Sequence, residues 1–533
     1  MDLEQSLVTA WRARVARHPD APAIAYFDGH LTARELDAES DALAVALADL
    51  GTGRGDRVGI HLQNVPQYAV LLLALWKLGA TALVLNPMYR GPELRHLIDD
   101  AGAIGVVCAD SDAAGMSEDL AGSGVRWHLS TSALDYQTRN DPRAFPSADR
   151  AVPAPDGDLV DLVRRYRGRR PEPVDITADE LALLTYTSGT TGPPKGAMNT
   201  HGNVLAVTSS FREWAGLGPG DVVFGMAPLF HITGAVVNAA LALLSDTVLA
   251  LTGRFQPAVA LDAFVEHGVT YTIGSITAYN AMSQVPGASA EHFRSAKRLY
   301  SGGAPIPPAT VTRFEERFGP YIHNGYGMTE TTSAVIAVPP GERAPVHGPS
   351  GTLSIGRALP GVTARVIGTD GAPLPAGEQG ELELSGPQIV PGYWNNPDAT
   401  ASTMPDGRLR TGDVAIIDTD GWVYLVDRLK DQINSSGYKV WPREVEDALC
   451  AHPAVLEAAV VGEPDEYRGE TVVAYVALQD GREASGEELI AFSREHLAAY
   501  KAPRAVHIVR QLPKTPTGKI RRADLRDSSR SDR

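Results

Sequence analysis

A loop rich in glycine and hydroxyl side chains most strongly constrains what this chain can be. It covers residues 185–196, follows the apolar run 181–184, and reads Thr-Tyr-Thr-Ser-Gly-Thr-Thr-Gly-Pro-Pro-Lys-Gly. Backbone N–H groups, hydroxyls and an ammonium in such a loop can bind a polyphosphate. The P-loop of ordinary NTPases has Lys directly before Ser or Thr. Here Lys195 precedes Gly196 and follows two prolines, so this is a different kind of phosphate loop.

Length and composition exclude several other classes of protein. The chain has 533 residues, 44% hydrophobic and 21% charged, which suits a globular enzyme of more than one domain. Its net charge of −16 argues against nucleic acid as the main partner. The two cysteines, Cys108 and Cys450, have no metal-type spacing and favour a reduced, cytoplasmic protein. The N-terminus lacks a secretory pattern, and neither apolar stretch, 65–76 or 222–245, reads as a membrane span.

The hydrophobic pattern predicts layered α/β sheets over the first part of the chain. Strands are expected at 57–62 and 269–273, and helices at 43–47, 68–78, 259–267 and 311–318. Residues 130–173 are rich in Asp, Arg and Pro with little periodicity, and are interpreted as a long surface excursion.

The pattern of expected secondary structure changes after residue 362. Short alternating strands at 364–367, 381–384 and 422–426 predict a small β-rich, barrel-like part. From residue 428, helices at 442–449 and 487–499 and strands at 457–461, 472–478 and 505–509 predict a compact α+β domain. The fold class is therefore α/β, with an N-terminal domain over 1–427 and a small C-terminal domain over 428–533.

The loop and several later segments together resemble a known family. Residues 187–195 resemble the signature loop of the adenylate-forming enzymes, which include acyl-CoA and aryl-CoA synthetases, nonribosomal peptide adenylation domains and luciferases. The family's other motifs follow in order over essentially the whole chain. The resemblance implies ATP, Mg²⁺ and coenzyme A as cofactor or co-substrate. It assigns the ATP phosphates to Thr187, Ser188, Gly189, Thr190, Thr191 and Lys195, the last also as a catalytic residue.

Residues 326–331 resemble the second core motif of the family. By that resemblance Thr329 contacts phosphate and Glu330 is a catalytic ligand of Mg²⁺, a hard cation that prefers oxygen ligands. The alternative is that Glu330 is only an exposed charged residue in a surface turn. The loop 301–305 looks like the family's adenine and acyl-phosphate loop, with Asn324, Gly325 and Tyr326 across the base. Its predicted contacts come from Gly303, Ala304 and Pro305.

The segment Arg-Thr-Gly-Asp at 410–413 resembles the ribose-binding motif, in which Asp413 accepts from the sugar hydroxyls and Arg428 donates to them. Lys430 takes the family's hinge position. Gly437 lies in a loop that resembles the CoA-step motif near the pantetheine. Some aryl-CoA ligases have lysines where this chain has Asn434 and Ser436, which slightly weakens an aryl assignment.

Lys519 lies in Pro-Thr-Gly-Lys near the C-terminus. It looks like the family's catalytic lysine, which approaches the carboxylate and α-phosphate from a domain that can swing away. Considered alone, it would be an ordinary exposed lysine.

The acid pocket is less well marked. Residues 227–234 resemble the segment that borders the carboxylate, in which His231 is either a wall and gate or a catalytic proton carrier. The predicted lining is Phe230, His231, Thr233, Gly234, Ile276, Tyr279, Gly302 and Gly327. Arg254 lies where the family often offers a cation to the CoA phosphates, or it is a solvated charge.

The resemblance implies an ATP-dependent acyl-CoA synthetase that forms acyl-AMP and then the CoA thioester. A medium- or long-chain fatty acid is the favoured substrate and an aryl or cinnamoyl-type acid the runner-up. A standalone ligase that passes its adenylate to an amine or a carrier-protein thiol stays open. A non-catalytic nucleotide-binding paralogue would have lost Lys195, Glu330, Asp413 or Lys519, and all four are present. The expected partners are small molecules, with no nucleic acid and no membrane span, for a monomer or homodimer.

Overall fold

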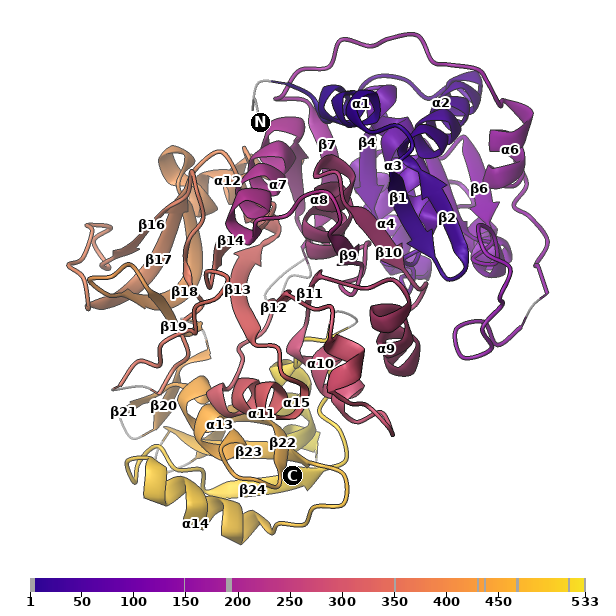
Figure 1. Cartoon of the computed structure of the whole chain (residues 1–533). Coiled ribbons are helices and arrows are strands. Elements are labelled where there is room, and N and C mark those ends of the chain that lie inside the picture. Colours follow the sequence, from indigo (N-terminus) through magenta and orange to yellow (C-terminus); the bar gives the residue numbers. More distant parts are fainter. Residues whose placement is uncertain are drawn as a thin grey trace.

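Two large sheets form the bulk of the protein (Figure 1). The computed structural model describes residues 5–147, 149–187, 194–348, 351–428, 431–435, 438–465, 469–515 and 518–531. The first sheet has six strands in the order β6-β5-β3-β4-β7-β8, all parallel except for the β7–β8 pair. Its strands are β3 (Arg57–His61), β4 (Thr81–Val84), β5 (Gly105–Ala109), β6 (Trp127–Thr131), β7 (Leu181–Tyr186) and β8 (Gly196–Thr200).

The second sheet has nine strands in the order β15-β14-β13-β12-β11-β9-β10-β1-β2. Its central run from β13 to β1 is parallel, and the edge pairs are antiparallel. The strands are β1 (Pro22–Tyr26), β2 (Gly29–Thr32), β9 (Val222–Phe224), β10 (Val248–Leu251), β11 (Tyr271–Gly274), β12 (Arg298–Ser301), β13 (Ile322–Met328), β14 (Ser333–Ala337) and β15 (Arg357–Ala358).

The main core combines strands of both sheets with the helices between them. In α3 (Pro66–Lys77) every residue is buried, and Pro66 at its first turn suits a helix start. Helix α2 (Ala33–Asp49) begins with a capping box in which Thr32 and Glu35 satisfy each other's backbone N–H groups. The other helices of this part are α1 (Leu7–Arg17), α4 (Gly91–Ala101), α5 (Ala113–Asp119), α6 (Leu159–Arg165), α7 (His201–Ala215), the π-helical η2 (Gly234–Ala240), α8 (Leu241–Leu244), α9 (Pro257–Glu266), α10 (Ile276–Ser283) and α11 (Pro308–Phe318).

The β-rich part is a four-stranded antiparallel sheet, seen at the left of Figure 1. It consists of β16 (Thr363–Ile367), β17 (Gln379–Ser385), β18 (Leu409–Ile417) and β19 (Val423–Arg428), with α12 (Pro397–Thr403) before β18. The three strand segments expected from sequence therefore all lie in one sheet.

The C-terminal part is a five-stranded sheet with helices, orange to yellow in Figure 1. Its strands are β20 (Ile433–Ser435), β21 (Tyr438–Val440), β22 (Val455–Asp465), β23 (Gly469–Leu478) and β24 (Ala505–Val509), and its helices α13 (Pro442–Cys450), α14 (Gly486–His496) and α15 (Arg522–Ser531). It contacts the large domain through α11, where the Arg313 guanidinium donates to the carbonyl of Cys450 at 3.0 Å.

The expected surface excursion at 130–173 is wrong in part. Strand β6 ends inside it, and helix α6 packs on α2 through the buried Leu159, Val160 and Val163. Asp135 is buried too, where Arg150 pairs with it. The helix is only 7 residues long, too short for an apolar period to stand out in a polar segment.

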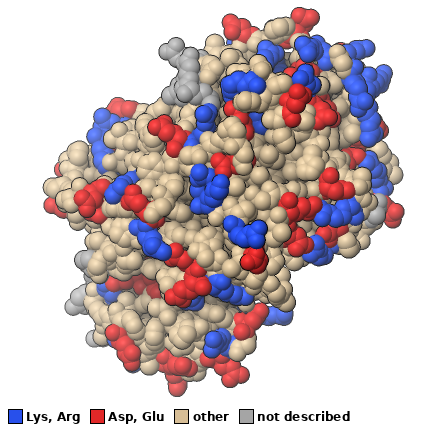
Figure 2. All heavy atoms as spheres, viewed as in Figure 1, with Lys and Arg blue, Asp and Glu red and all other residues tan. Residues whose placement is uncertain are grey.

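The surface carries both signs of charge. Figure 2 shows acidic and basic side chains interspersed over the visible face. In the part of the chain that the structure describes, no helix has both the length and the hydropathy needed to cross a membrane.

Candidate functional site

Four loops meet at one edge of the nine-stranded sheet. They follow β9, β11, β12 and β13, which are neighbours in the order β13-β12-β11-β9 and run parallel. Carboxyl ends of parallel strands lie at the same edge, where ligands of α/β proteins usually bind. These loops bring together His231 after β9, Ser275 after β11, the segment 302–306 after β12, and Glu330 after β13.

Lys519 reaches this edge from the small domain. Its Cε lies 3.3 Å from the position that a Cβ would take on Gly303, a residue with φ of +80° that favours glycine. The preceding residue is docked as well, because the Thr277 hydroxyl donates to the carbonyl of Gly518 at 2.9 Å. The structure thus places the predicted catalytic lysine against the predicted adenine and acyl-phosphate loop.

His231 follows β9 at the same edge and is near enough to Lys519 to respond to its charge. Its Nδ1 accepts from the backbone N–H of Thr233 at 3.3 Å, which assigns the ring proton to Nε2. Burial, with the charge of Lys519 added, lowers the pKa of His231 to about 3. The imidazole therefore carries no charge near neutral pH, and both its role as a wall and its role as a proton carrier stay predictions.

Lys195 and Glu330 both contact Tyr393. The Tyr393 hydroxyl donates to Oε1 of Glu330 at 2.6 Å, and Nζ of Lys195 lies 4.5 Å from the centre of the Tyr393 ring. The ends of the signature loop are joined, since the Thr187 N–H donates to the Lys195 carbonyl at 2.9 Å. Asn199 also donates to the carbonyl of Thr329 at 3.2 Å, so both phosphate motifs are tied together.

The predicted ribose and adenine residues are also neighbours. The Tyr326 hydroxyl donates to Oδ2 of the buried Asp413 at 2.7 Å. Asp413 is paired in register with Arg428 across β18 and β19. A Cβ on Gly302 would lie 2.9 Å from the carbonyl of Gly325, so the loop after β12 packs closely on strand β13 there.

Comparisons with known proteins assign the family. The AMP-binding enzyme model matches residues 11–394, and the AMP-binding enzyme C-terminal domain model matches residues 444–519. The chain belongs to the AMP-binding enzyme family. The predicted adenylate-forming superfamily, its fold class and the class of AMP-forming acid–CoA ligases are confirmed.

Relatives of differing specificity have similar sequence identity to this AMP-binding enzyme. A feruloyl-CoA synthase of Amycolatopsis sp is 34% identical over 97% of this chain and 98% of its own. A long-chain-fatty-acid–CoA ligase of Salmonella typhimurium is 33% identical over 99% and 95%. The crystal structure of ATP-bound MatB from Rhodopseudomonas palustris superposes with a TM-score of 0.86 at 29% identity, covering 99% of this chain and 100% of that one.

Some predicted site residues cannot be placed in this AMP-binding enzyme. Ser188, Gly189, Thr190, Thr191, Lys430 and Gly437 lie outside the described residues, and only the backbone of Arg428 is described. Ala304 and Pro305 lie in the loop after β12, beside Gly303. Arg254 is exposed, and the structure shows it in no ion pair with the described residues, so both of its interpretations stay open.

Three predicted pocket residues are closely packed in the structure. Tyr279 has no exposed surface, its hydroxyl donates to the carbonyl of Tyr300 at 2.9 Å, and its ring packs on Phe314. It is part of the core beneath the site. A Cβ on Gly234 would lie 2.0 Å from the carbonyl of Pro228, and one on Gly327 would lie 1.9 Å from that of Ser333. Backbone packing therefore requires glycine at both positions, and their place in the acid pocket stays a prediction. Among the other predicted lining residues, Phe230 and Ile276 are buried and Thr233 is half-buried.

Gly234→Ala is expected to destabilise the AMP-binding enzyme by about 1–3 kcal/mol, because the new methyl group meets the Pro228 carbonyl. The melting temperature and the acid preference of the variant are to be measured together. The matched control is Gly115→Ala, a helical glycine with no atom within 4 Å of an added Cβ. Full stability with a shift toward shorter acids would contradict this prediction and support Gly234 as a residue that lines the acid pocket.

The sequence interpretation missed two residues of the site. Tyr393 lies in a Gly-Tyr-Trp segment before α12. In sequence, nothing distinguishes it from an aromatic residue of the hydrophobic core. Thr277 lies 241 residues from Gly518, to which its hydroxyl donates, and is one of many threonines. Only the contacts reveal either residue.

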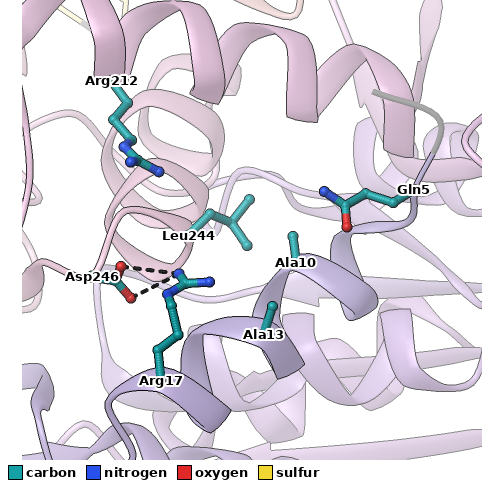
Figure 3. A pocket seen from close by; sticks show the side chains of 7 residues that line it. All are labelled: Gln5, Ala10, Ala13, Arg17, Arg212, Leu244 and Asp246. Atoms are coloured by element: carbon teal, nitrogen blue, oxygen red, sulfur yellow. Dashed lines mark hydrogen bonds and ion pairs between the residues drawn. The ribbon is translucent and has the colours of Figure 1, made fainter. Parts of the chain in front are cut away.

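A surface pocket of about 260 Å³ lies elsewhere, between α1, α7 and α8 (Figure 3). Its lining contains none of the predicted site residues: Gln5, Ala10, Ala13, Arg17, Arg212, Leu244 and Asp246. Arg17 and Asp246 pair at 3.0 Å across it. The pocket is therefore separate from the adenylation motifs.

Proposed function

We propose that this AMP-binding enzyme joins an apolar carboxylic acid to coenzyme A through an acyl-AMP intermediate, with a medium- or long-chain fatty acid as the substrate. The observation that carries the proposal is the position of Lys519. A lysine from the small domain lies against the loop of Gly303, where a carboxylate and an α-phosphate would meet, and its charge acts on His231.

In the first half-reaction the carboxylate oxygen attacks the α-phosphorus of ATP, a P–O bond forms, and the bond to pyrophosphate breaks. No enzyme nucleophile is required, so positioning and charge neutralisation account for the rate. Lys519 offsets the charge that develops at the acid and α-phosphate, and Lys195 offsets that of the leaving phosphates. Asp413, held by Tyr326, accepts from the ribose hydroxyls. Neutral His231 borders the acid without adding a charge.

The residues present fit a Mg²⁺ ion. Glu330 is buried, one of its oxygens accepts from Tyr393, and it forms no ion pair with the residues that the structure describes. Among the residues that the structure describes, no group of three or more His, Cys, Asp or Glu side chains could hold a metal ion by itself. One carboxylate together with substrate phosphates and water is the usual environment of Mg²⁺, which would neutralise phosphate charge when bound. Glu330 would hold it.

The second half-reaction requires the small domain, proposed to cover residues 428–533, to rotate away from domain 1–427. The contacts described above for residues 518 and 519 are a hydrogen bond and packing against Gly303, which rotation can break. The CoA thiol then attacks the acyl carbonyl, and AMP leaves. Gly437 is proposed to line the thiol path, and Arg254 to contact a CoA phosphate. Both cysteines are free and buried, which supports a cytoplasmic enzyme.

A panel of acids tests the proposed substrate. Pyrophosphate release is measured with fatty acids of about 6 to 18 carbons and with cinnamic-type acids, with and without CoA. Each added CH₂ group tests how much apolar surface the pocket can bury. We expect the highest kcat/KM for a medium- or long-chain acid, and thioester formation only with CoA. A preference for cinnamic acids would establish the aryl alternative, which the feruloyl-CoA synthase relative supports. Product formed only with an added amine would establish the amide-forming alternative.

A further inference from the structure

Tyr393 lies between two groups of opposite charge in the phosphate site. Its hydroxyl donates to Glu330 Oε1 at 2.6 Å, and the Lys195 ammonium faces its ring at 4.5 Å from the centre. Tyr393 is 3% exposed and Glu330 is buried, so the hydroxyl bond between them is shielded from solvent, whereas Lys195 is half-buried. A cation over an aromatic face and a carboxylate on the phenol edge both suit the ring's charge distribution.

The backbone around Tyr393 holds the ring rigidly against both partners. Tyr393 is bridged to Ala197, and the Trp394 N–H donates to the Gly196 carbonyl at 2.7 Å, directly after Lys195. The Val390 N–H donates to the carbonyl of Glu330 at 3.0 Å. The segment 390–394 therefore binds the end of the signature loop on one side and the Glu330 turn on the other.

Lys195 and Glu330 would attract each other if the ring were absent. Two unlike charges in a shielded site gain more by pairing than they do in water. In the structure neither forms an ion pair with any described residue, although both touch the same tyrosine. An internal Lys195–Glu330 pair would remove the cation from the phosphates and the carboxylate from the metal at once.

We propose that Tyr393 is a positioning residue that keeps Lys195 and Glu330 apart and orients Glu330 toward a divalent metal. The proposal rests on the proposed function, in which Glu330 holds Mg²⁺. The Tyr393 hydroxyl occupies one carboxylate oxygen, which leaves the remaining lone pairs for the ion. Hydrogen bonds to a metal-binding carboxylate fix its orientation, and their loss typically weakens metal binding by about 10–100-fold.

Tyr393→Phe tests the hydroxyl, since phenylalanine keeps the ring and its packing. Mn²⁺ binding is measured by electron paramagnetic resonance in the presence of a non-hydrolysable ATP analogue, which does not depend on turnover. We expect the affinity for Mn²⁺ to fall by about 10–100-fold. The control is Tyr475→Phe, which removes an equivalent hydroxyl bond, 3.1 Å long, from Tyr475 to the buried Glu463 in the small domain. Its Mn²⁺ affinity should equal that of the unmodified enzyme.

Tyr393→Leu tests the ring itself. Without it Lys195 can pair with Glu330, so affinity for metal-free ATP, measured with a fluorescent analogue in chelator, should fall severalfold. Tyr393→Phe should keep the affinity for metal-free ATP, because its ring can still contact the Lys195 ammonium. If leucine unfolds the enzyme, the phenylalanine variant alone decides the metal-orienting part.

Unchanged Mn²⁺ affinity in Tyr393→Phe would overturn the proposal, provided that Glu330→Gln weakens it. If Glu330→Gln also leaves Mn²⁺ binding unchanged, Glu330 is not the metal ligand and the proposed function fails at that point instead. A loss of metal-free ATP binding in Tyr393→Phe equal to that of Tyr393→Leu would contradict the separate role of the ring.

Discussion

Lys519→Ala is expected to reduce acyl-AMP formation by about 10²–10³-fold, the usual loss when one positioned group that stabilises transition-state charge is removed. In the structure this lysine reaches the loop of Gly303 from the small domain. The variant should still convert supplied acyl-AMP and CoA to thioester, because the lysine would have left the site by then. Single-turnover kinetics of the two half-reactions measure both effects.

Lys514→Ala is the matched control, because Lys514 lies on the same segment but pairs with Glu457 of the small domain at 2.7 Å. It should retain acyl-AMP formation close to that of the unmodified enzyme. Equal damage to both half-reactions in Lys519→Ala would refute the two-orientation mechanism, although not the family. The complementary variant at Gly437, in which a bulky residue should block the CoA step and spare adenylation, stays a prediction from sequence.

Glu330→Gln should lower the rate of adenylation at saturating MgATP by roughly 10²-fold or more, since the metal loses its charged oxygen ligand. The fold should be preserved, because the glutamine carbonyl can still accept from Tyr393. The measurement is acyl-AMP formation against free Mg²⁺ concentration, with the apparent Mg²⁺ affinity expected to fall as well.

Glu463→Gln controls for the loss of a buried carboxylate that accepts from a tyrosine, since Glu463 accepts from Tyr475 in the small domain. It should leave the Mg²⁺ dependence unchanged. Near-normal acyl-AMP formation by Glu330→Gln at low free Mg²⁺ would show that another group holds the metal.

Much of the fold could be predicted where local pattern dominates. The apolar run before the signature loop is β7, and the expected helix at 68–78 is the fully buried α3. Helix α6 was missed because burial of Leu159, Val160 and Val163 depends on α2, far away in sequence. The order of β13, β12, β11 and β9 is a further result of long-range pairing that periodicity does not contain.

The same division applies to the site. Lys195, Glu330, Asp413 and Lys519 could be proposed from sequence because each lies in a short motif that resembles one of the family, and their roles stay predictions. The close packing of Tyr279 and Gly234 depends on contacts with Tyr300 and Pro228.

The sequence by itself thus determined the family and most element types, because these depend on neighbouring residues along the chain. Only the tertiary structure decided that Lys519 meets the Gly303 loop and that Tyr393 contacts both Lys195 and Glu330. Tyr393 and Glu330 are 63 residues apart, and Thr277 and Gly518 are 241 apart. Such contacts arise from the packing of whole sheets and domains, and no local pattern of residue types specifies them.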